Sequence, residues 1–187
     1  MEPLLNQKMS QLHHRHSIRL PGYDYTAAGA YFITICTQDR ACLFGQVVDG
    51  EMRLSNIGKI AQAQWEQIPA RFENIEIGPN IVMPDHMHGI LIVRAGLAPA
   101  SGQPQGPGQP QGLPLPKAVG DIVGAYKSLV VNECLKVFKS QNRFLGKVWQ
   151  RNYYEHIIRD EQSYENIAAY ILNNPRQWEA DQLFKAG

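Results

Sequence analysis

The sequence has few cysteines and no long apolar run, and these absences exclude several classes of protein. Its 187 residues include only Cys36, Cys42 and Cys134, and none of them forms a CxxC pair. Neither a disulfide framework nor a cysteine zinc site is indicated, and we expect the three thiols to be reduced and buried. No stretch reaches the apolar length of a membrane span, and the N-terminus has no apolar run before a small-residue cleavage site. We therefore predict a cytoplasmic protein with no membrane partner.

The chain also lacks a strong net charge, which is +1 at pH 7 with 19% charged residues. Charge alone neither suggests nor excludes nucleic acid, because a basic face balanced by an acidic one gives the same sum. Hydrophobic residues make up 44% of the chain, enough for one domain with a real core. We expect a single domain over 1–187 with a flexible Pro/Gly/Gln-rich insertion at about 95–116, where apolar side chains are too few to offset the ordering entropy.

Hydrophobic patterning divides the rest of the chain into strands and amphipathic helices. Asp49-Gly50 predicts a hairpin turn, and Ser55 or Asn56 caps the helix that follows it. The elements in order are a strand at 30–38, a hairpin at 43–55, a helix at 56–72, a strand at 83–93, a helix at 117–138, a strand at 148–160, and a helix at 163–184 that is broken near Pro175. This order predicts an α+β fold with a ferredoxin-like antiparallel sheet and helices packed on it.

Two histidines open the apolar strand "MPDHMHGILIV", residues 83–93. Side chains alternate along a strand, so His86 and His88 share one face, and we place Pro84 at a bulge or at the strand entry. Neutral imidazole is a common metal ligand, so the pair suggests a divalent metal site. The spacing fits equally well two polar residues at a half-exposed strand start. Two histidines are also too few for a metal site without further ligands.

The last helix offers candidates for the missing ligand and for a nucleophile. Asn166, Tyr170 and Asn174 form a row at i, i+4 and i+8, beside the apolar stripe that contains Tyr164. The phenol and the carboxamide lie about 6 Å apart along the axis. Two simpler interpretations remain open, because a helical tyrosine often packs in the core and an Asn directly before Pro175 can cap a following helix.

Four stretches in their order along the chain resemble the bacterial REP-associated tyrosine transposases. They are "HRHSIRLPGYDYTAAGAYFITICTQDR", "IVMPDHMHGILIV", "VWQRNYYEHIIRD" and "YILNNPRQW". That family consists of domesticated relatives of the single-strand insertion-sequence transposases of the His-hydrophobe-His (HUH) class. The likeness runs from about residue 13 to residue 178, apart from the Pro/Gly/Gln-rich segment, and it implies the HUH nuclease fold.

The resemblance also implies roles for individual residues. His86 and His88 would bind Mg²⁺ or Mn²⁺, Tyr170 would be the single catalytic nucleophile, and Asn174 would be the third ligand. Mobile relatives place Gln four residues after the tyrosine, where this chain has Asn, and family members often carry Asn at the position of Asp85. The implied substrate is single-stranded DNA with a REP-type hairpin, and the implied intermediate is a 5′-phosphotyrosine. We expect a monomer or a homodimer.

Several basic residues are candidates for DNA contact. They are Arg15, His16, Arg19, Lys127 and Arg151. The same residues fit a solvated tail or a solvated helix face. Two other functions also remain open: a hairpin-binding protein with the transposase fold but no cleavage activity, and a metal-dependent hydrolase that uses activated water.

Overall fold

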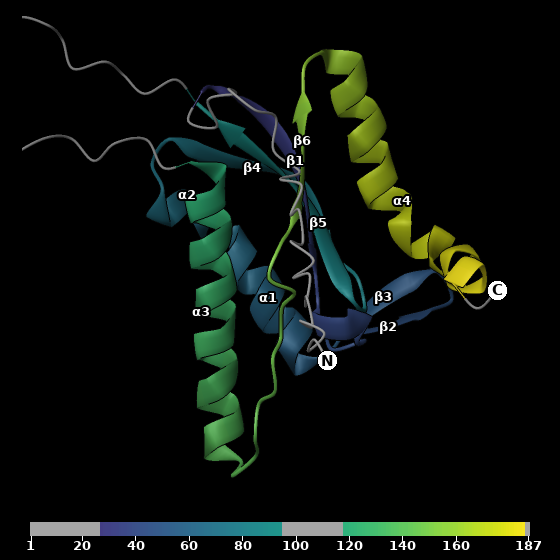
Figure 1. The fold of residues 1–187 in the computed structure, drawn as a ribbon. Coiled ribbons are helices and arrows are strands. Elements are labelled where there is room, and N and C mark those ends of the chain that lie inside the picture. The colour runs from purple at the N-terminus through teal and green to yellow at the C-terminus, as the bar shows by residue number, and fades with distance from the viewer. Residues whose placement is uncertain (1–26, 95–117, 186–187) are drawn as a thin grey trace, which may run out of the picture.

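The structure, a computed structural model, describes residues 27–94 and 118–185 (Figure 1). The elements in order are β1 (Gly29–Cys36), the 3-10 helix η1 (Gln38–Arg40), β2 (Gly45–Val48), β3 (Glu51–Leu54), α1 (Asn56–Glu66), α2 (Ile68–Arg71), β4 (Ile75–Val82), β5 (His86–Val93), α3 (Val119–Ser140), β6 (Tyr154–Ile158) and α4 (Glu161–Lys185). Among these elements no helix is long and apolar enough to cross a membrane.

Four strands form one antiparallel sheet in the order β4-β5-β1-β6, and β2 and β3 form a separate hairpin. Helices α1 and α3 lie on one side of the large sheet and α4 lies on the other, so the fold is α+β with helices packed on an antiparallel sheet (Figure 1). The predicted fold class is therefore confirmed. The histidine strand β5 is an inner strand, as the sequence predicts.

Alternation along β1 separates the two faces of the sheet. Tyr31, Ile33 and Ile35 are fully buried in the main core, which includes side chains of α1 and α3. Phe32 points to the other face and packs with a smaller apolar cluster that contains Ile171 of α4. Period-two patterning therefore places one half of each strand in the main core and the other half toward α4.

The predicted turn and cap both form. Asp49 and Gly50 have φ angles of 54° and 73°, as a two-residue hairpin turn with left-handed residues requires. The Oγ of Ser55 accepts a hydrogen bond from the backbone N–H of Gly58 at 3.1 Å, so Ser55 is the N-cap of α1.

Three expectations about the elements are wrong. Strand β4 was not predicted, because Gly78-Pro79 in its middle is typical of a turn, and the register shifts there between Ile77 and Asn80. Strand β6 begins only at Tyr154, six residues after the expected start at 148. Helix α4 is not broken, because it continues through Pro175, which removes one hydrogen bond from the helix without ending it.

The cysteines follow the prediction only in part. All three thiols are free, but Cys134 alone is buried, while Cys36 is half-buried and Cys42 is exposed. Burial of Cys42 is therefore a wrong expectation, because it lies in the short connection that leads into β2 rather than in a strand.

Candidate active site

The two histidines converge on the face of the sheet that carries α4. The Nε2 atoms of His86 and His88 lie 3.0 Å apart, and each residue is only 5% exposed. The strand spacing therefore brings the two imidazoles together in a buried site, as the alternation of β5 predicts.

Each imidazole is held through its other ring nitrogen. The Nδ1 of His86 lies 2.6 Å from Oδ1 of Asp85, and a carboxylate can only accept there, so this Nδ1 carries the proton. The Nδ1 of His88 lies 2.8 Å from the hydroxyl of Thr34, which is the partner of His88 in the β1–β5 register. In the neutral ring with its proton on Nδ1, the Nε2 of His86 offers a lone pair, and Thr34 allows the same arrangement for His88.

Arg40 and Thr37 fix Asp85 from its other side. The Nε of Arg40 pairs with Oδ2 of Asp85 at 2.9 Å, while Thr37 donates both its backbone N–H and its hydroxyl to the Asp85 carbonyl at 2.9 Å. Arg40 and the preceding Asp39 have φ angles of 56° and 54°, a region that costs energy for residues other than glycine. This strained turn orients Arg40 toward the carboxylate that holds His86.

The histidine strand needs a glycine at position 89 because the indole of Trp65 lies directly against its backbone there. A Cβ at Gly89 would lie 2.4 Å from Cζ2 of Trp65, which is fully buried in α1. The indole therefore occupies the space behind His88, on the opposite face of β5. Close contact between α1 and the sheet at this point keeps the histidine strand in place.

The environment of His88 keeps its imidazole neutral. Burial above all, together with the nearby His86 and Arg40, lowers the pKa of His88 to about 3, whereas Asp85 acts in the opposite direction. At neutral pH the ring is therefore uncharged, which is the state that can donate a lone pair to a cation.

Helix α4 adds the phenol of Tyr170 to the histidine pair and carries a buried carboxamide, that of Asn174, one turn further on. The hydroxyl of Tyr170 lies 3.4 Å from Nε2 of His88, and this tyrosine is 43% exposed. Asn174 is 1% exposed, and its Oδ1 is a buried acceptor without a hydrogen-bond partner in the described structure. The row predicted from helical periodicity thus reaches the histidines through Tyr170, and Asn174 is buried one turn further along α4, whereas Asn166 is exposed and bonds to Gln162.

Two aromatic residues that the sequence analysis did not select also line the site. Phe32 stacks on the ring of His88 at a centroid distance of 5.2 Å, and Trp178 lies 5.9 Å from the ring of His86. Trp178 follows Asn174 by four residues, so a further step along the same helical row would have found it. Phe32 has no such signal, because it comes from a different strand.

The other candidate tyrosines lie elsewhere. Tyr153 packs against the main core and donates to Glu155 at 2.7 Å, on the face of the sheet opposite the histidines. Tyr164, which belongs to the apolar stripe predicted for this helix, is half-buried against the small cluster under α4. Tyr154 is 46% exposed and contacts Phe32 edge-on at 6.4 Å. In the described part of the chain, Tyr170 is thus the tyrosine whose hydroxyl meets the histidine pair.

The chain has relatives whose names and folds bear on this site. No family model matches it. An uncharacterized protein of Haemophilus influenzae is 42% identical over 178 residues, which cover 92% of this chain and 94% of that protein, and the chain belongs to the same family. A second H. influenzae protein, named as a REP-associated tyrosine transposase, is 26% identical over 153 residues, covering 81% of this chain and 73% of that protein.

A solved structure of a REP-associated tyrosine transposase bound to a REP hairpin has the same fold. It matches with a TM-score of 0.54 at 19% identity, over 83% of this chain and 71% of that one. The resemblance to the REP-associated tyrosine transposases is confirmed. The histidine pair and Tyr170 therefore lie within a transposase fold.

The structure places two of the five candidate DNA-binding residues. Arg15, His16 and Arg19 lie outside the described residues, as does the insertion at about 95–116. Lys127 donates from Nζ to the carbonyls of Gln150, Arg151 and Asn152 at 2.9 to 3.3 Å, and burial lowers its pKa to about 8. The side chain of Arg151 is exposed. Lys127 thus holds the segment before β6, and DNA contact by either residue stays a prediction.

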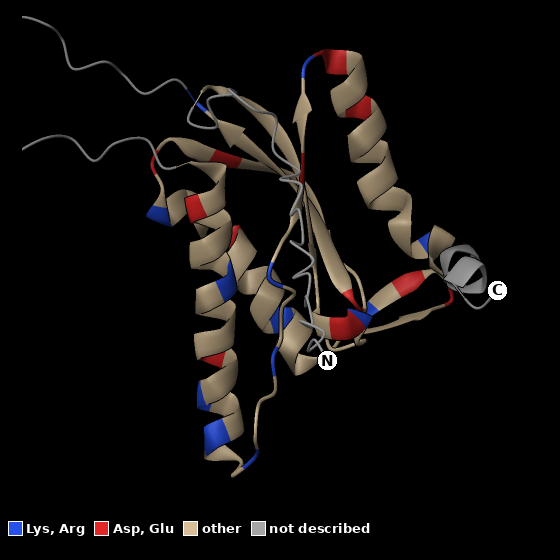
Figure 2. Cartoon of the chain, viewed as in Figure 1, with Lys and Arg blue, Asp and Glu red and all other residues tan. Residues whose placement is uncertain are grey.

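Helix α3, which carries Lys127, contains both basic and acidic residues. Figure 2 shows basic and acidic residues interspersed along this helix, and Lys136 pairs with Glu133 at 2.6 Å. Helix α3 also lies across the sheet from the histidines (Figure 1).

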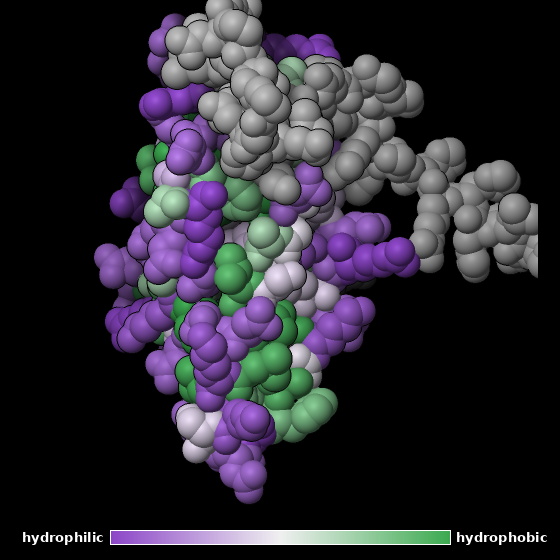
Figure 3. Space-filling view, turned by 90° about the vertical axis from the view of Figure 1, so that its left-hand side faces the viewer, coloured by the Kyte–Doolittle hydropathy of each residue, from purple (hydrophilic) through white to green (hydrophobic). Residues whose placement is uncertain are grey.

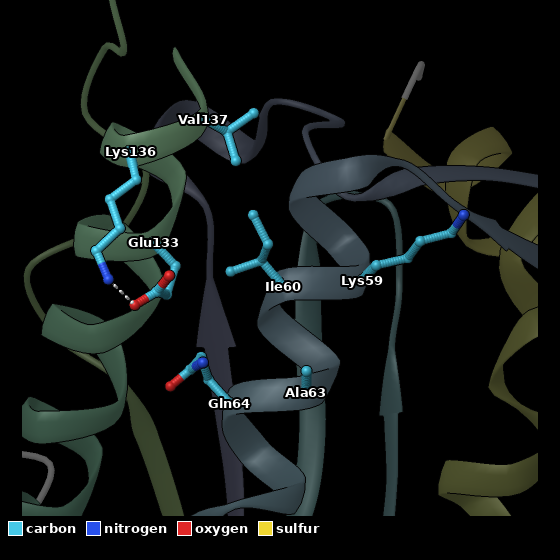
Figure 4. A pocket seen from close by; sticks show the side chains of 7 residues that line it. All are labelled: Lys59, Ile60, Ala63, Gln64, Glu133, Lys136 and Val137. Carbon is cyan, nitrogen blue, oxygen red and sulfur yellow. Dashed lines mark hydrogen bonds and ion pairs between the residues drawn. The ribbon is translucent and has the colours of Figure 1, made fainter. Parts of the chain in front are cut away.

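A pocket of about 300 Å³ lies between α1 and α3, far from the histidine face (Figure 4). It is lined by Lys59, Ile60, Ala63, Gln64, Glu133, Lys136 and Val137. On this side of the molecule, apolar residues are visible among polar ones near the C-terminal end of α3 (Figure 3), where Leu135 and Phe144 are exposed. None of the residues named at the histidine site contributes to this pocket.

Proposed function

We propose that the protein is a metal-dependent single-stranded DNA endonuclease and strand transferase that acts at REP-type DNA hairpins through a 5′-phosphotyrosine intermediate. One observation carries the proposal: the Tyr170 hydroxyl, part of an exposed side chain, lies 3.4 Å from a neutral histidine of a buried pair. The transposase fold, the name of the 26% identical relative and the hairpin bound to the structural neighbour support the choice of DNA.

The donor atoms at the site fit Mg²⁺ or Mn²⁺. Two nitrogens that occupy neighbouring positions of an octahedral ion, each at about 2.1 Å, are about 3.0 Å apart. This matches the observed separation of 3.0 Å between the Nε2 atoms of His86 and His88. The unpartnered Oδ1 of Asn174 supplies an oxygen ligand. The described residues contain no group of three or more His, Cys, Asp or Glu that could hold a metal, and the proposal therefore takes its third donor from the amide of Asn174.

A bound cation would neutralise a non-bridging phosphate oxygen and leave coordination positions open for the substrate. The residues of the chain perform the other tasks. Asp85 keeps the proton of His86 on Nδ1, so that its Nε2 stays available, and burial keeps His88 neutral. Tyr170 presents its hydroxyl beside the same atoms from a different element, where it can meet a phosphate held by the histidine side.

The chemical step balances without a further reactant. The Oη of Tyr170 forms a bond to phosphorus while the bond from phosphorus to the 3′ oxygen breaks, and the proton lost by the phenol ends on that oxygen as a 3′-hydroxyl. Attack by a second 3′-hydroxyl reverses the step and releases Tyr170. Strands are therefore rejoined without ATP, because the phosphotyrosine bond conserves the energy of the phosphodiester.

The proposal is tested by incubation of the protein with Mn²⁺ and a DNA hairpin with single-stranded flanks, labelled in parallel at its 3′ or its 5′ end. A 5′-phosphotyrosine retains the 3′ label on the protein in a denaturing gel, while the 5′ label leaves as a shorter strand. Tyr170→Phe should abolish the labelled protein band, and Tyr153→Phe, on the opposite face of the sheet, should keep it.

Other outcomes would identify the alternatives. Cleavage with both labels on free DNA would show a hydrolase that uses water. A gel shift of the hairpin without cleavage would show a binding protein. Persistence of the covalent band in Tyr170→Phe would mean that the nucleophile is a different residue.

A further inference from the structure

The sheet face that carries the histidines is covered unevenly. Helix α4 packs mainly on β4, which is the edge strand on one side of β5. On the other side, β1 carries half-buried side chains on this face, including Phe32, and β6 carries exposed ones, Tyr154 at 46% exposure and His156. Among the described residues, α4 therefore lies on the β4 side of the histidine pair, and the exposed side chains of β6 lie on the other.

Aromatic rings lead from the histidines to this open surface. Phe32 stacks on His88 and meets Tyr154 edge-on at 6.4 Å and Tyr170 edge-on at 6.2 Å. In the strand register, Thr34 is the partner of both His88 and Tyr154, so these three residues form one row across β5, β1 and β6. The exposed ring of Tyr154 is thus joined to the proposed catalytic residues through a single ring, Phe32.

The chemistry of this surface suits a nucleobase. Every base has an aromatic face, and stacking on an exposed ring of a sheet is a common way to hold single-stranded nucleic acid without reading its sequence. A strand with its phosphate between Tyr170 and His88 must continue past the site, and in the described part of the chain the exposed ring of Tyr154 lies next to Phe32 on the side away from β4. An isolated surface tyrosine has no such neighbours, whereas this one ends a continuous set of ring contacts.

We propose that Phe32 and Tyr154 form a stacking subsite for a base close to the phosphate that Tyr170 attacks. This proposal rests on the proposed function, because that function supplies the single-stranded DNA. Tyr154 provides the exposed face on which the base lies. Phe32 supports Tyr154 and links its position to that of His88.

The test uses Tyr154→Leu, because Phe32 contacts His88 and its replacement would disturb the histidine pair. The probe is a synthetic REP-type hairpin with single-stranded flanks that carry 2-aminopurine at one position at a time, and its fluorescence is titrated with protein in the absence of cleavage. At one flank position the wild type should quench 2-aminopurine. Tyr154→Leu should lose the quenching and bind about tenfold more weakly, as expected for loss of one stacked base. Tyr154→Phe, which keeps the ring, should behave as the wild type.

Two controls make the result specific. Phe144→Leu removes an exposed ring, 91% accessible, at the far end of α3, and it should leave quenching and affinity unchanged. An abasic nucleotide at the quenched position should weaken binding of the wild type and have no further effect on Tyr154→Leu. Equal affinity of Tyr154→Leu and wild type, or additive losses with the abasic DNA, would overturn the subsite. Quenching without any covalent adduct would refute the proposed cleavage and retain the subsite, whereas an adduct without quenching would do the reverse.

Discussion

Replacement of Asp85 by Ala should weaken metal binding without touching a proposed metal ligand. Asp85 is 2% exposed, and its Oδ1 lies 2.6 Å from Nδ1 of His86. Without the carboxylate, His86 loses the partner that keeps its proton on Nδ1 and its Nε2 directed at the site. Loss of such a partner lowers metal affinity about 10- to 100-fold. In free energy this is about 1.4 to 2.7 kcal/mol.

The same change leaves a buried N–H of His86 unpaired and removes the ion-pair partner of Arg40. An unpaired buried donor costs about 1 to 3 kcal/mol of stability. The melting temperature of a chain of this size should then fall by roughly 2 to 12 °C. Isothermal titration with Mn²⁺ separates the two effects, because it measures affinity at a temperature where the variant is folded.

Two further variants show whether the effect belongs to the hydrogen bond at His86. In Asp85→Asn the amide oxygen can still accept from Nδ1, so Mn²⁺ affinity should fall less than in Asp85→Ala. Glu133→Gln removes the carboxylate of an exposed pair with Lys136 and should change neither affinity nor melting temperature noticeably. Wild-type Mn²⁺ affinity in Asp85→Ala would refute the role of Asp85, and an equal loss in Glu133→Gln would show that the effect is not local.

Three other changes test separate parts of the structure. His86→Ala and His88→Ala should each abolish cleavage and weaken Mn²⁺ binding while gel shifts show hairpin binding mostly intact, and an equal loss of hairpin binding would contradict their role as ligands. Gly89→Ala places a Cβ about where Trp65 lies and should cost about 1 to 3 kcal/mol by thermal denaturation; an unchanged melting temperature would contradict the close contact. A short Gly/Ser linker in place of residues 96–114 should keep the melting temperature within a few degrees, because the sequence there is poor in apolar residues. A large loss of stability would refute this.

Sequence periodicity was sufficient to predict which side chains lie together where the site residues belong to one strand or one helix. Alternation along a strand is enough to bring His86 and His88 to one face, and helical spacing is enough to place Tyr170 one turn before Asn174. Neither inference needs knowledge of what packs against the element. The turn at Asp49-Gly50 and the cap at Ser55 are equally local, and both form as predicted.

Sequence periodicity could not predict the contacts between segments that are far apart in the chain. Arg40 meets Asp85 across 45 positions of the chain because Thr37 binds the backbone of Asp85, and nothing in the pattern around either residue indicates this. In the sequence, Phe32 has the pattern of an ordinary strand residue, although its ring stacks on His88 in the structure. Strand β4 was missed for a related reason: its pairing with β5 tolerates the Gly78-Pro79 irregularity, which alone indicates a turn.

The role proposed for Asn174 depends both on the helical spacing within α4 and on how α4 packs against the histidine strand. The resemblance described above implies Gln at this position in mobile insertion-sequence transposases, and the Asn of this chain is shorter by one methylene. Its amide nevertheless lies buried at 1% exposure, and one turn further along α4 the ring of Trp178 reaches that of His86 at 5.9 Å. Helix α4 contacts the histidines through Tyr170 and Trp178, one turn before and one turn after Asn174, so the ligand role proposed for Asn174 requires only a short side chain. Continuation of α4 through Pro175 is what allows this arrangement, since a helix that ended there would not place Trp178 over His86.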